Sequence, residues 1–109
     1  MWKILNSVDD LNEIDQRSIE KPQLLFKHST RCSISSMAKN RLDLQLDMLT
    51  SQYDCYYLDL IQYRSVSNEI SSRYGVEHES PQVIVVKKGK ALYDVSHHMI
   101  KPDVIISST

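Results

Sequence analysis

The stretch FKHSTRCSIS, residues 26–35, joins an apolar, strand-like run to a helical pattern and is the most informative part of this sequence. The apolar run Leu24–Phe26 is continuous rather than alternating, which is typical of a strand covered on both faces. A polar turn, Ser29–Arg31, follows it, and apolar residues then recur at steps of three and four. Cys32 is therefore expected where a strand ends and a helix begins.

The helical pattern after this turn is long and amphipathic. Charged residues separate its apolar positions and are expected to form a solvated face. The apolar positions are Ile34, Met37, Ala38, Leu42, Leu46 and Leu49. We expect one continuous helix from near Cys32 to Leu49.

The remaining elements can be placed by similar signals. Ser7 and Asp10 have the spacing of a capping box and predict a helix over residues 8–19, while Gly75 and the KKGK turn mark later chain reversals. We expect, in order, strands over 2–5 and 23–28, the Cys32 helix, a strand over 55–61, a helix over 63–74, strands over 82–88 and 91–96, and a short helix from Pro102.

This order of strands and helices predicts an α/β fold in a single domain spanning residues 1–109. Alternating strands and helices indicate parallel pairing, and the closing hairpin adds an antiparallel edge, so the sheet is expected to be mixed. Cys32 then lies at the carboxyl end of a strand, which is where open α/β sheets place their chemistry.

Composition narrows the function further. The chain has 109 residues, a net charge of -1 and 41% hydrophobic residues, so it lacks the basic character of most proteins that bind nucleic acid or membrane surfaces. No apolar run is long enough for a membrane span or a signal peptide, which favours a cytoplasmic protein. Two cysteines do not suggest a disulfide framework. We expect a monomer without a tightly bound cofactor.

Cys32 is the candidate nucleophile. The thiolate attacks disulfides, and the unpaired N–H groups of a helix's first turn favour that anion. Arg31 is adjacent, Thr30 and His28 are near in sequence, and the Ser35 hydroxyl is placed to donate a hydrogen bond to the sulfur. The alternative is a small buried hydrophobic residue. The strand-to-helix position favours the nucleophile.

Two other positions bear on this site. Ser80-Pro81 directly precedes the most apolar strand, where proline fits because it cannot donate to a sheet ladder, and an X-Pro bond in a tight turn is a candidate for the cis form. Cys55 begins a predicted strand, at the opposite end of the sheet from Cys32. We therefore expect Cys55 to be a buried or intermolecular thiol rather than a resolving cysteine.

The histidines and tyrosines are given structural interpretations. The four histidines, residues 28, 78, 97 and 98, form no spacing typical of a metal site, and His28 alone is close enough to Cys32 to tune the thiol. The clustered tyrosines, residues 53, 56, 57 and 63, lack the basic field of a nucleic-acid surface and are expected to pack in the core and at its edge.

Together these motifs resemble a known family. Cys-x-x-Ser after a strand, with a proline before a closing hairpin, is similar to the thioredoxin-like fold, a three-layer sandwich around a central mixed sheet. More closely, FKHSTRCSISSMA and ESPQVIVVKKGKALYDVSH resemble the monothiol bacilliredoxins of the bacillithiol system. Their usual Thr-x-Cys-Pro-Ile-Ser reads here as residues 30–35 with Ser33 in place of proline.

The resemblance implies a redox function. Because Ser35 stands where thioredoxins have a second cysteine, only monothiol exchange remains at this motif. Cys32 would take bacillithiol from S-bacillithiolated proteins as a mixed disulfide, and a further thiol or reductase would regenerate it. The loop at Ser80 and Pro81 would bind the substrate, and bacillithiol would be the co-substrate.

Two alternatives remain open at this point. A monothiol-glutaredoxin-like protein would bind glutathione and an iron–sulfur cluster, but such proteins usually have Gly-Phe where this chain has Ser33-Ile34. A non-enzymatic stress or partner-binding domain on the same fold would retain Cys32 without using it.

Overall fold

The computed structural model describes residues 1–109 and contains a five-stranded mixed sheet. Its strands are β1 (Lys3–Ile4), β2 (Gln23–His28), β3 (Asp54–Asp59), β4 (Gln82–Lys87) and β5 (Lys90–Ser96). The spatial order is β1-β3-β2-β4-β5, with β1, β3 and β2 parallel and with β4 antiparallel to both β2 and β5. The predicted mixed α/β sheet is confirmed.

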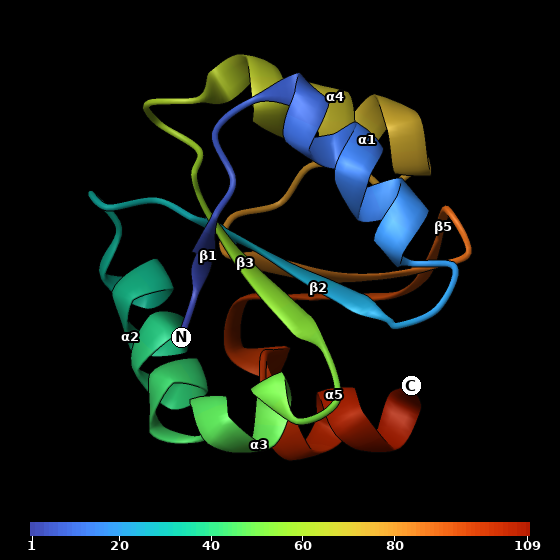
Figure 1. Cartoon of the computed structure of the whole chain (residues 1–109). Helices are drawn as coiled ribbons and strands as arrows, with labels where there is room; N and C mark the ends of the chain where they lie inside the picture. Colours follow the sequence, from blue (N-terminus) through green and yellow to red (C-terminus); the bar gives the residue numbers. More distant parts are fainter.

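Helices cover both faces of this sheet (Figure 1). They are α1 (Val8–Arg17), α2 (Ser33–Leu44), α3 (Leu46–Thr50), α4 (Arg64–Tyr74), the 3₁₀ helix η1 (His97–Met99) and α5 (Pro102–Ser108). In Figure 1, α1 and α4 lie together on one face, while α2, α3 and α5 lie on the other. None of these helices has both the length and the apolar character that a bilayer crossing requires.

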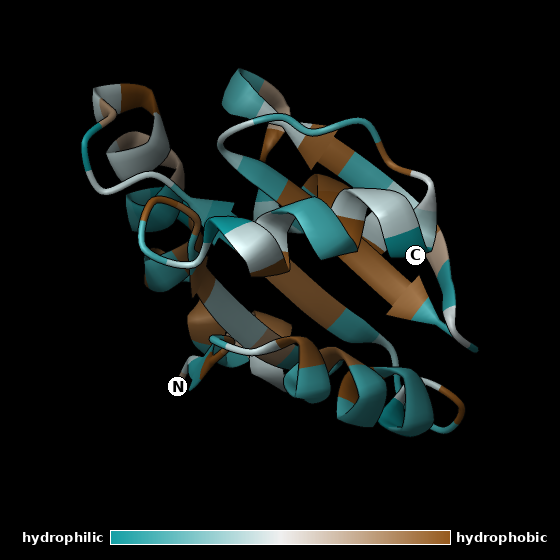
Figure 2. Ribbon diagram, turned by 90° about the horizontal axis from the view of Figure 1, so that it is seen from above, coloured by the Kyte–Doolittle hydropathy of each residue, from teal (hydrophilic) through white to brown (hydrophobic).

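Strand β2 is the centre of the molecule, and all six of its residues are buried. Leu25 faces the core beneath α1 and α4, while Leu24 and Phe26 face the core formed with α2, α3 and α5. Figure 2 shows the strands as a hydrophobic band between helices whose outer parts are hydrophilic. The continuous apolar run therefore folds as predicted, because a strand between two helical layers has no polar face.

Local signals set several element ends as expected. The Ser7 hydroxyl accepts the Asp10 N–H at 3.2 Å, and the Asp10 carboxylate accepts the Ser7 N–H at 3.2 Å, so the capping box of α1 is formed. Gly75 ends α4 in the left-handed conformation, with φ of 65°. The clustered tyrosines pack in or against the two cores, as expected.

Two predicted elements end two residues earlier than expected. The helix over 8–19 ends at Arg17, because Ser18 turns away and accepts the N–H groups of the β4–β5 turn at Lys88 and Gly89. The strand over 55–61 ends at Asp59, whose carboxylate accepts the Ile61 N–H at 3.1 Å and so turns the chain. Side-chain hydrogen bonds of this kind compete with regular structure.

The predicted continuous helix from Cys32 to Leu49 is also wrong, because it breaks at Gln45 into α2 and α3. Gln45 leaves the helical conformation, with φ of -123° and ψ of 27°. No glycine or proline marks the break, so the apolar pattern gave no sign of it. Leu42 and Leu49 still reach the same core on either side of the break.

Side chains tie α2 to both edges of the fold. The indole N–H of Trp2 donates to Asp43 at 2.7 Å, and the Trp2 ring packs on Phe26 with centroids 5.6 Å apart. Arg41 donates to the carbonyl oxygens of Ile100 and His97 at 2.9 and 3.1 Å. Arg41 was expected on a solvated face, but it holds the η1 segment against the helix.

Candidate active site

Cys32 occupies the expected junction between β2 and α2. It is the N-cap residue of α2, in extended conformation with φ of -115° and ψ of 124°, and it is partly exposed. Its N–H donates to the Ser29 carbonyl oxygen at 3.2 Å, which closes a tight turn after His28. The nucleophile candidate is therefore held by a short turn from a fully buried strand.

The amino end of α2 is open. The Cys32 side chain makes no capping hydrogen bond, and the N–H groups of residues 33–35 have no acceptor in the protein. The first intrahelical bond runs from the Ser36 N–H to the Cys32 carbonyl at 3.0 Å. The first turn of α2 therefore leaves free N–H groups beside Cys32.

Ser35 lies in this first turn and is fully buried. It does not make the hydrogen bond to the Cys32 sulfur that we expected. Its hydroxyl oxygen accepts the Ser29 N–H at 3.0 Å and lies 2.6 Å from Nδ1 of His28. No hydrogen bond joins Ser35 to Cys32. Ser35 acts instead on the turn that carries Cys32, because it binds residues on both sides of the strand end.

His28 is the buried partner of Ser35, with 4% of its surface exposed. Its ring lies against Phe26 and Tyr57, with centroids 5.6 Å away in each case. Burial lowers the pKa of His28, and the positive charge of Lys39 acts in the same direction. The imidazole is therefore neutral near pH 7, and we assign the Ser35 hydroxyl as the donor to Nδ1. His28 reaches Cys32 only through Ser35 and the turn.

The other two residues proposed to tune the thiol lie on the surface. Thr30 and Arg31 are exposed, and neither makes a side-chain hydrogen bond or an ion pair. Arg31 is thus free to face an anionic group beside Cys32. The four histidines do not combine with acids or cysteines into a cluster of three or more metal-ligating side chains.

The Ser80-Pro81 peptide is cis and lies at the same end of the sheet as the Cys32 turn. Lys27 pairs with Gln82 across β2 and β4, so Pro81 stands level with His28, the last residue of β2. The backbone N–H and C=O of Ser80 have no partner in the protein, and the Ser80 hydroxyl is buried without one. This segment therefore offers free backbone groups close to the Cys32 turn.

Sequence reasoning missed the environment of Lys27. Lys27 is 0% exposed, and its ammonium lies 2.7 Å from Nδ1 of His78. Burial lowers the Lys27 pKa to about 8, and the positive charge of Arg64 acts in the same direction. The available signal was a lysine inside a strand predicted to be covered on both faces.

Cys55 lies far from this end of the sheet. It pairs with Leu24, four residues before His28 on β2, a distance of about 13 Å along the strand. A disulfide needs Cα atoms within about 7 Å, so Cys55 is out of reach of Cys32. Burial raises the pKa of the Cys55 thiol to about 12, and the side chain is 1% exposed. The expected burial of Cys55 is confirmed.

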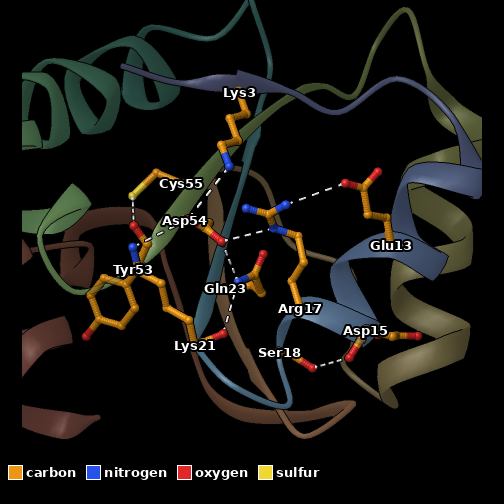
Figure 3. Close-up of polar contacts among 10 residues, drawn as sticks. All are labelled: Lys3, Glu13, Asp15, Arg17, Ser18, Lys21, Gln23, Tyr53, Asp54 and Cys55. Atoms are coloured by element: carbon orange, nitrogen blue, oxygen red, sulfur yellow. Dashed lines mark hydrogen bonds and ion pairs between the residues drawn. The ribbon is translucent and has the colours of Figure 1, made fainter.

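An ionic network closes the end of the sheet beside Cys55, as Figure 3 shows. Asp54 lies 3.7, 3.3 and 3.5 Å from the cationic groups of Lys3, Arg17 and Lys21, and it accepts the Gln23 amide at 2.9 Å. Burial alone would raise the Asp54 pKa, but the Gln23 and Arg17 hydrogen bonds hold it below its usual value.

Comparisons with known proteins agree with this geometry. A structure described as a candidate oxidoreductase with a thioredoxin fold superposes with a TM-score of 0.84 at 28% identity, covering 96% of this chain and 90% of that one. The thioredoxin of Malassezia sympodialis gives a TM-score of 0.78 at 14% identity, covering 99% and 87%. The thioredoxin of Fasciola hepatica gives 0.73 at 13%, covering 97% and 95%. The last two show the fold alone.

These likenesses establish the thioredoxin-like fold, and a family model narrows the assignment. The model described as Monothiol bacilliredoxin BrxC matches residues 3–105, which is nearly the whole chain. The match spans the Cys32 turn, the Ser80-Pro81 segment and the closing hairpin. Family and fold together support a thiol-disulfide oxidoreductase. The chain belongs to the monothiol bacilliredoxin family.

Proposed function

We propose that this protein removes bacillithiol from S-bacillithiolated proteins by monothiol exchange at Cys32. The observation that carries the proposal is the contrast between its two thiols: Cys32 is partly exposed at a helix start, and Cys55 is buried and out of reach. Ser35 occupies the position of a second cysteine and cannot form a disulfide. The family match supplies bacillithiol as the expected small thiol.

In the first step, the Cys32 thiolate attacks the bacillithiol sulfur of a protein–bacillithiol disulfide. A new S–S bond joins Cys32 to bacillithiol while the old S–S bond breaks, and the substrate cysteine leaves as a thiolate that takes a proton from water. In the second step, another thiol or a reductase attacks the bacillithiol sulfur and releases Cys32 as a thiolate. The protein is a carrier in which no net oxidation remains after both steps.

The surrounding residues have separate roles in this proposal. The free N–H groups at the start of α2 and the exposed Arg31 would face the sulfur anion that Cys32 presents as attacker and leaving group, and Thr30 borders the same turn. Ser35 and His28 hold the turn in shape. The free backbone groups at Ser80 would pair with an extended segment of the substrate, as strands pair at an open edge.

The proposal also sets the partners. They are bacillithiolated proteins, bacillithiol itself and a regenerating thiol or reductase, and the protein would act as a monomer. A reducing compartment such as the cytoplasm keeps thiols available for the second step.

The test is a transfer experiment followed by intact-protein mass spectrometry. A protein carrying one bacillithiol mixed disulfide is mixed with this chain, and we expect the mass of one bacillithiol to move to Cys32. Cys55→Ala is the matched control and should still accept the adduct, whereas Cys32→Ala should not. Equal transfer by Cys32→Ala, or an adduct on Cys55, would contradict the proposal.

A further inference from the structure

Lys27 is a buried cation without an acidic partner. It lies in the middle layer of the molecule, 0% exposed, and no carboxylate comes within ion-pairing distance of its ammonium. Its one hydrogen bond is to Nδ1 of His78, at 2.7 Å. Buried charges are costly unless they are paired, so an unpaired lysine in the central strand calls for a specific role.

The charged groups around Lys27 and His78 indicate which of the two side chains carries the proton. Burial disfavours the charged form of Lys27, as does the positive charge of Arg64 at the start of α4, whereas the negative charge of Glu79 favours it. Burial lowers the His78 pKa, as do the charges of Lys27 and Arg64. The ammonium of Lys27 therefore donates to a neutral His78 ring, which also lies 3.4 Å from the hydroxyl of Ser67 on α4. The pair carries one positive charge.

His78 belongs to the segment of residues 76–81 that links α4 to β4 and ends at the Ser80-Pro81 peptide. The Gln82 amide donates to the Glu77 carbonyl at 3.0 Å, and Glu79 lies 3.5 Å from His97, so other contacts tie the segment to β4 and η1. Lys27 supplies the only side-chain hydrogen bond between this segment and β2. Strand β2 is also the strand that leads into Cys32.

We propose that Lys27 is a positioning residue for thiol exchange: through His78 it holds residues 76–81, and with them the Ser80-Pro81 peptide, in place beside the Cys32 turn. The inference rests on the proposed function for its catalytic meaning. Its structural half, that Lys27 orders this segment, is tested separately from activity.

The first test measures amide hydrogen exchange in the folded protein at Val76 and Glu79, whose N–H groups donate to the Ser71 carbonyl and to the Gln82 side chain. Lys27→Met keeps the length of the side chain and removes the donor, and we expect exchange about tenfold faster, the effect of losing one charge-assisted hydrogen bond. Lys90→Met removes the same charge from an exposed lysine and should leave exchange unchanged. His78→Ala should reproduce the increase, while His78→Asn, which keeps an acceptor near Nδ1, should restore most of the protection.

Exchange in Lys27→Met equal to the wild-type rate would overturn the inference. Removing an unpaired buried cation relieves a desolvation cost, so we expect the stability of Lys27→Met to equal or exceed that of the wild type, and global unfolding would then not mimic the result. A urea unfolding curve of the variant checks this point.

The second test uses transfer kinetics from a bacillithiolated protein. We expect Lys27→Met to raise KM between about two- and tenfold with kcat within about twofold of wild type, because the segment receives substrate and does not take part in bond exchange. An unchanged KM would overturn the positioning role. If the wild-type protein transfers nothing, the proposed function fails, and hydrogen exchange alone decides whether Lys27 orders the segment.

Discussion

The two cysteines of this chain lie at opposite ends of the same sheet and have opposite surroundings. Cys32 follows the carboxyl end of β2, partly exposed, at a helix start whose N–H groups are free. Cys55 lies near the amino end of β3, 1% exposed, beside the ionic network of Asp54. The difference shows that strand direction, rather than residue type, decides which thiol is accessible.

The largest expected difference between the two cysteines is in their rates of alkylation. In the folded protein at pH 8, a thiol with a pKa of about 12 is ionised in about one molecule in ten thousand, so Cys55 should react with iodoacetamide at least about a thousandfold more slowly than Cys32. Peptide mapping by mass spectrometry after timed alkylation gives both rates. Similar alkylation rates for the two cysteines in the folded protein would contradict the contrast between an exposed Cys32 and a buried Cys55.

Removing Ser35 tests what holds the Cys32 end together. Ser35→Ala leaves the Ser29 N–H and the His28 ring without their partner, and we expect a loss of about 1–3 kcal/mol in the free energy of unfolding. Ser36→Ala, one position along on the exposed face, is the matched control and should change stability little. Urea unfolding measures both, and equal effects would show that the buried hydroxyl is not an anchor.

The same substitution at the two cysteines should have opposite signs. Cys55→Ser places a hydroxyl in the core and should destabilise the protein by about 1–3 kcal/mol. Cys32→Ser puts a favoured capping residue at an N-cap that has no side-chain bond, and should stabilise it by about 0.5–1 kcal/mol. Thermal or urea unfolding of the two variants checks both signs. A stabilising Cys55→Ser would contradict the assigned burial.

Ser33 offers a smaller effect at the Cys32 end. Ser33 is the first residue of α2, its N–H has no acceptor, and Cys32 already has the extended conformation that favours a following proline. Ser33→Pro, the usual residue of the family motif, should therefore stabilise the protein by up to about 1 kcal/mol. Ser36→Pro, inside the helix, is the contrasting control and should destabilise it. If Ser33→Pro lost stability as Ser36→Pro does, the proline of the family motif would be incompatible with this turn.

The smallest expected effect is the pH dependence of stability that comes from His28, at the Cys32 end of the sheet. Burial holds the folded-state pKa of His28 below its unfolded value of about 6.5, so the unfolded chain binds more protons in acid. Stability from this group is complete above about pH 6.5 and declines as the pH falls below it. Urea midpoints between pH 7 and 5 should fall less in His28→Asn than in wild type. An identical fall in both would assign the effect to other groups, of which His78 is the first candidate because its pKa is also lowered.

The sequence was a good guide to the elements around Cys32 because their signals are local. The apolar run of β2, the capping box of α1 and the glycine stop of α4 each depend on a few neighbouring residues. They place Cys32 at a strand-to-helix junction and Ser80-Pro81 before β4. Parallel and antiparallel pairing then follows from the element order, and it brings both segments to one end of the sheet.

Other features depend on contacts between distant residues, and the sequence did not show them. Ser35 is one helical turn from Cys32, which suggested a bond to the sulfur, but its partners are His28 and Ser29. Lys27 and His78 are 51 positions apart and meet only in the folded chain. The break at Gln45 has no glycine or proline to announce it. Local patterns specify periodicity, whereas side-chain partners are decided by packing.

The contact between Trp2 and α2 has an experimental consequence. Trp2 is the only tryptophan of the chain, and it bridges Phe26 of the central strand and Asp43 of the helix that begins after Cys32. Its fluorescence therefore comes from a single site, which lies where the helix meets the sheet. A stopped-flow trace of tryptophan fluorescence would record, without any added dye, whether α2 stays packed against the sheet during a thiol exchange at Cys32.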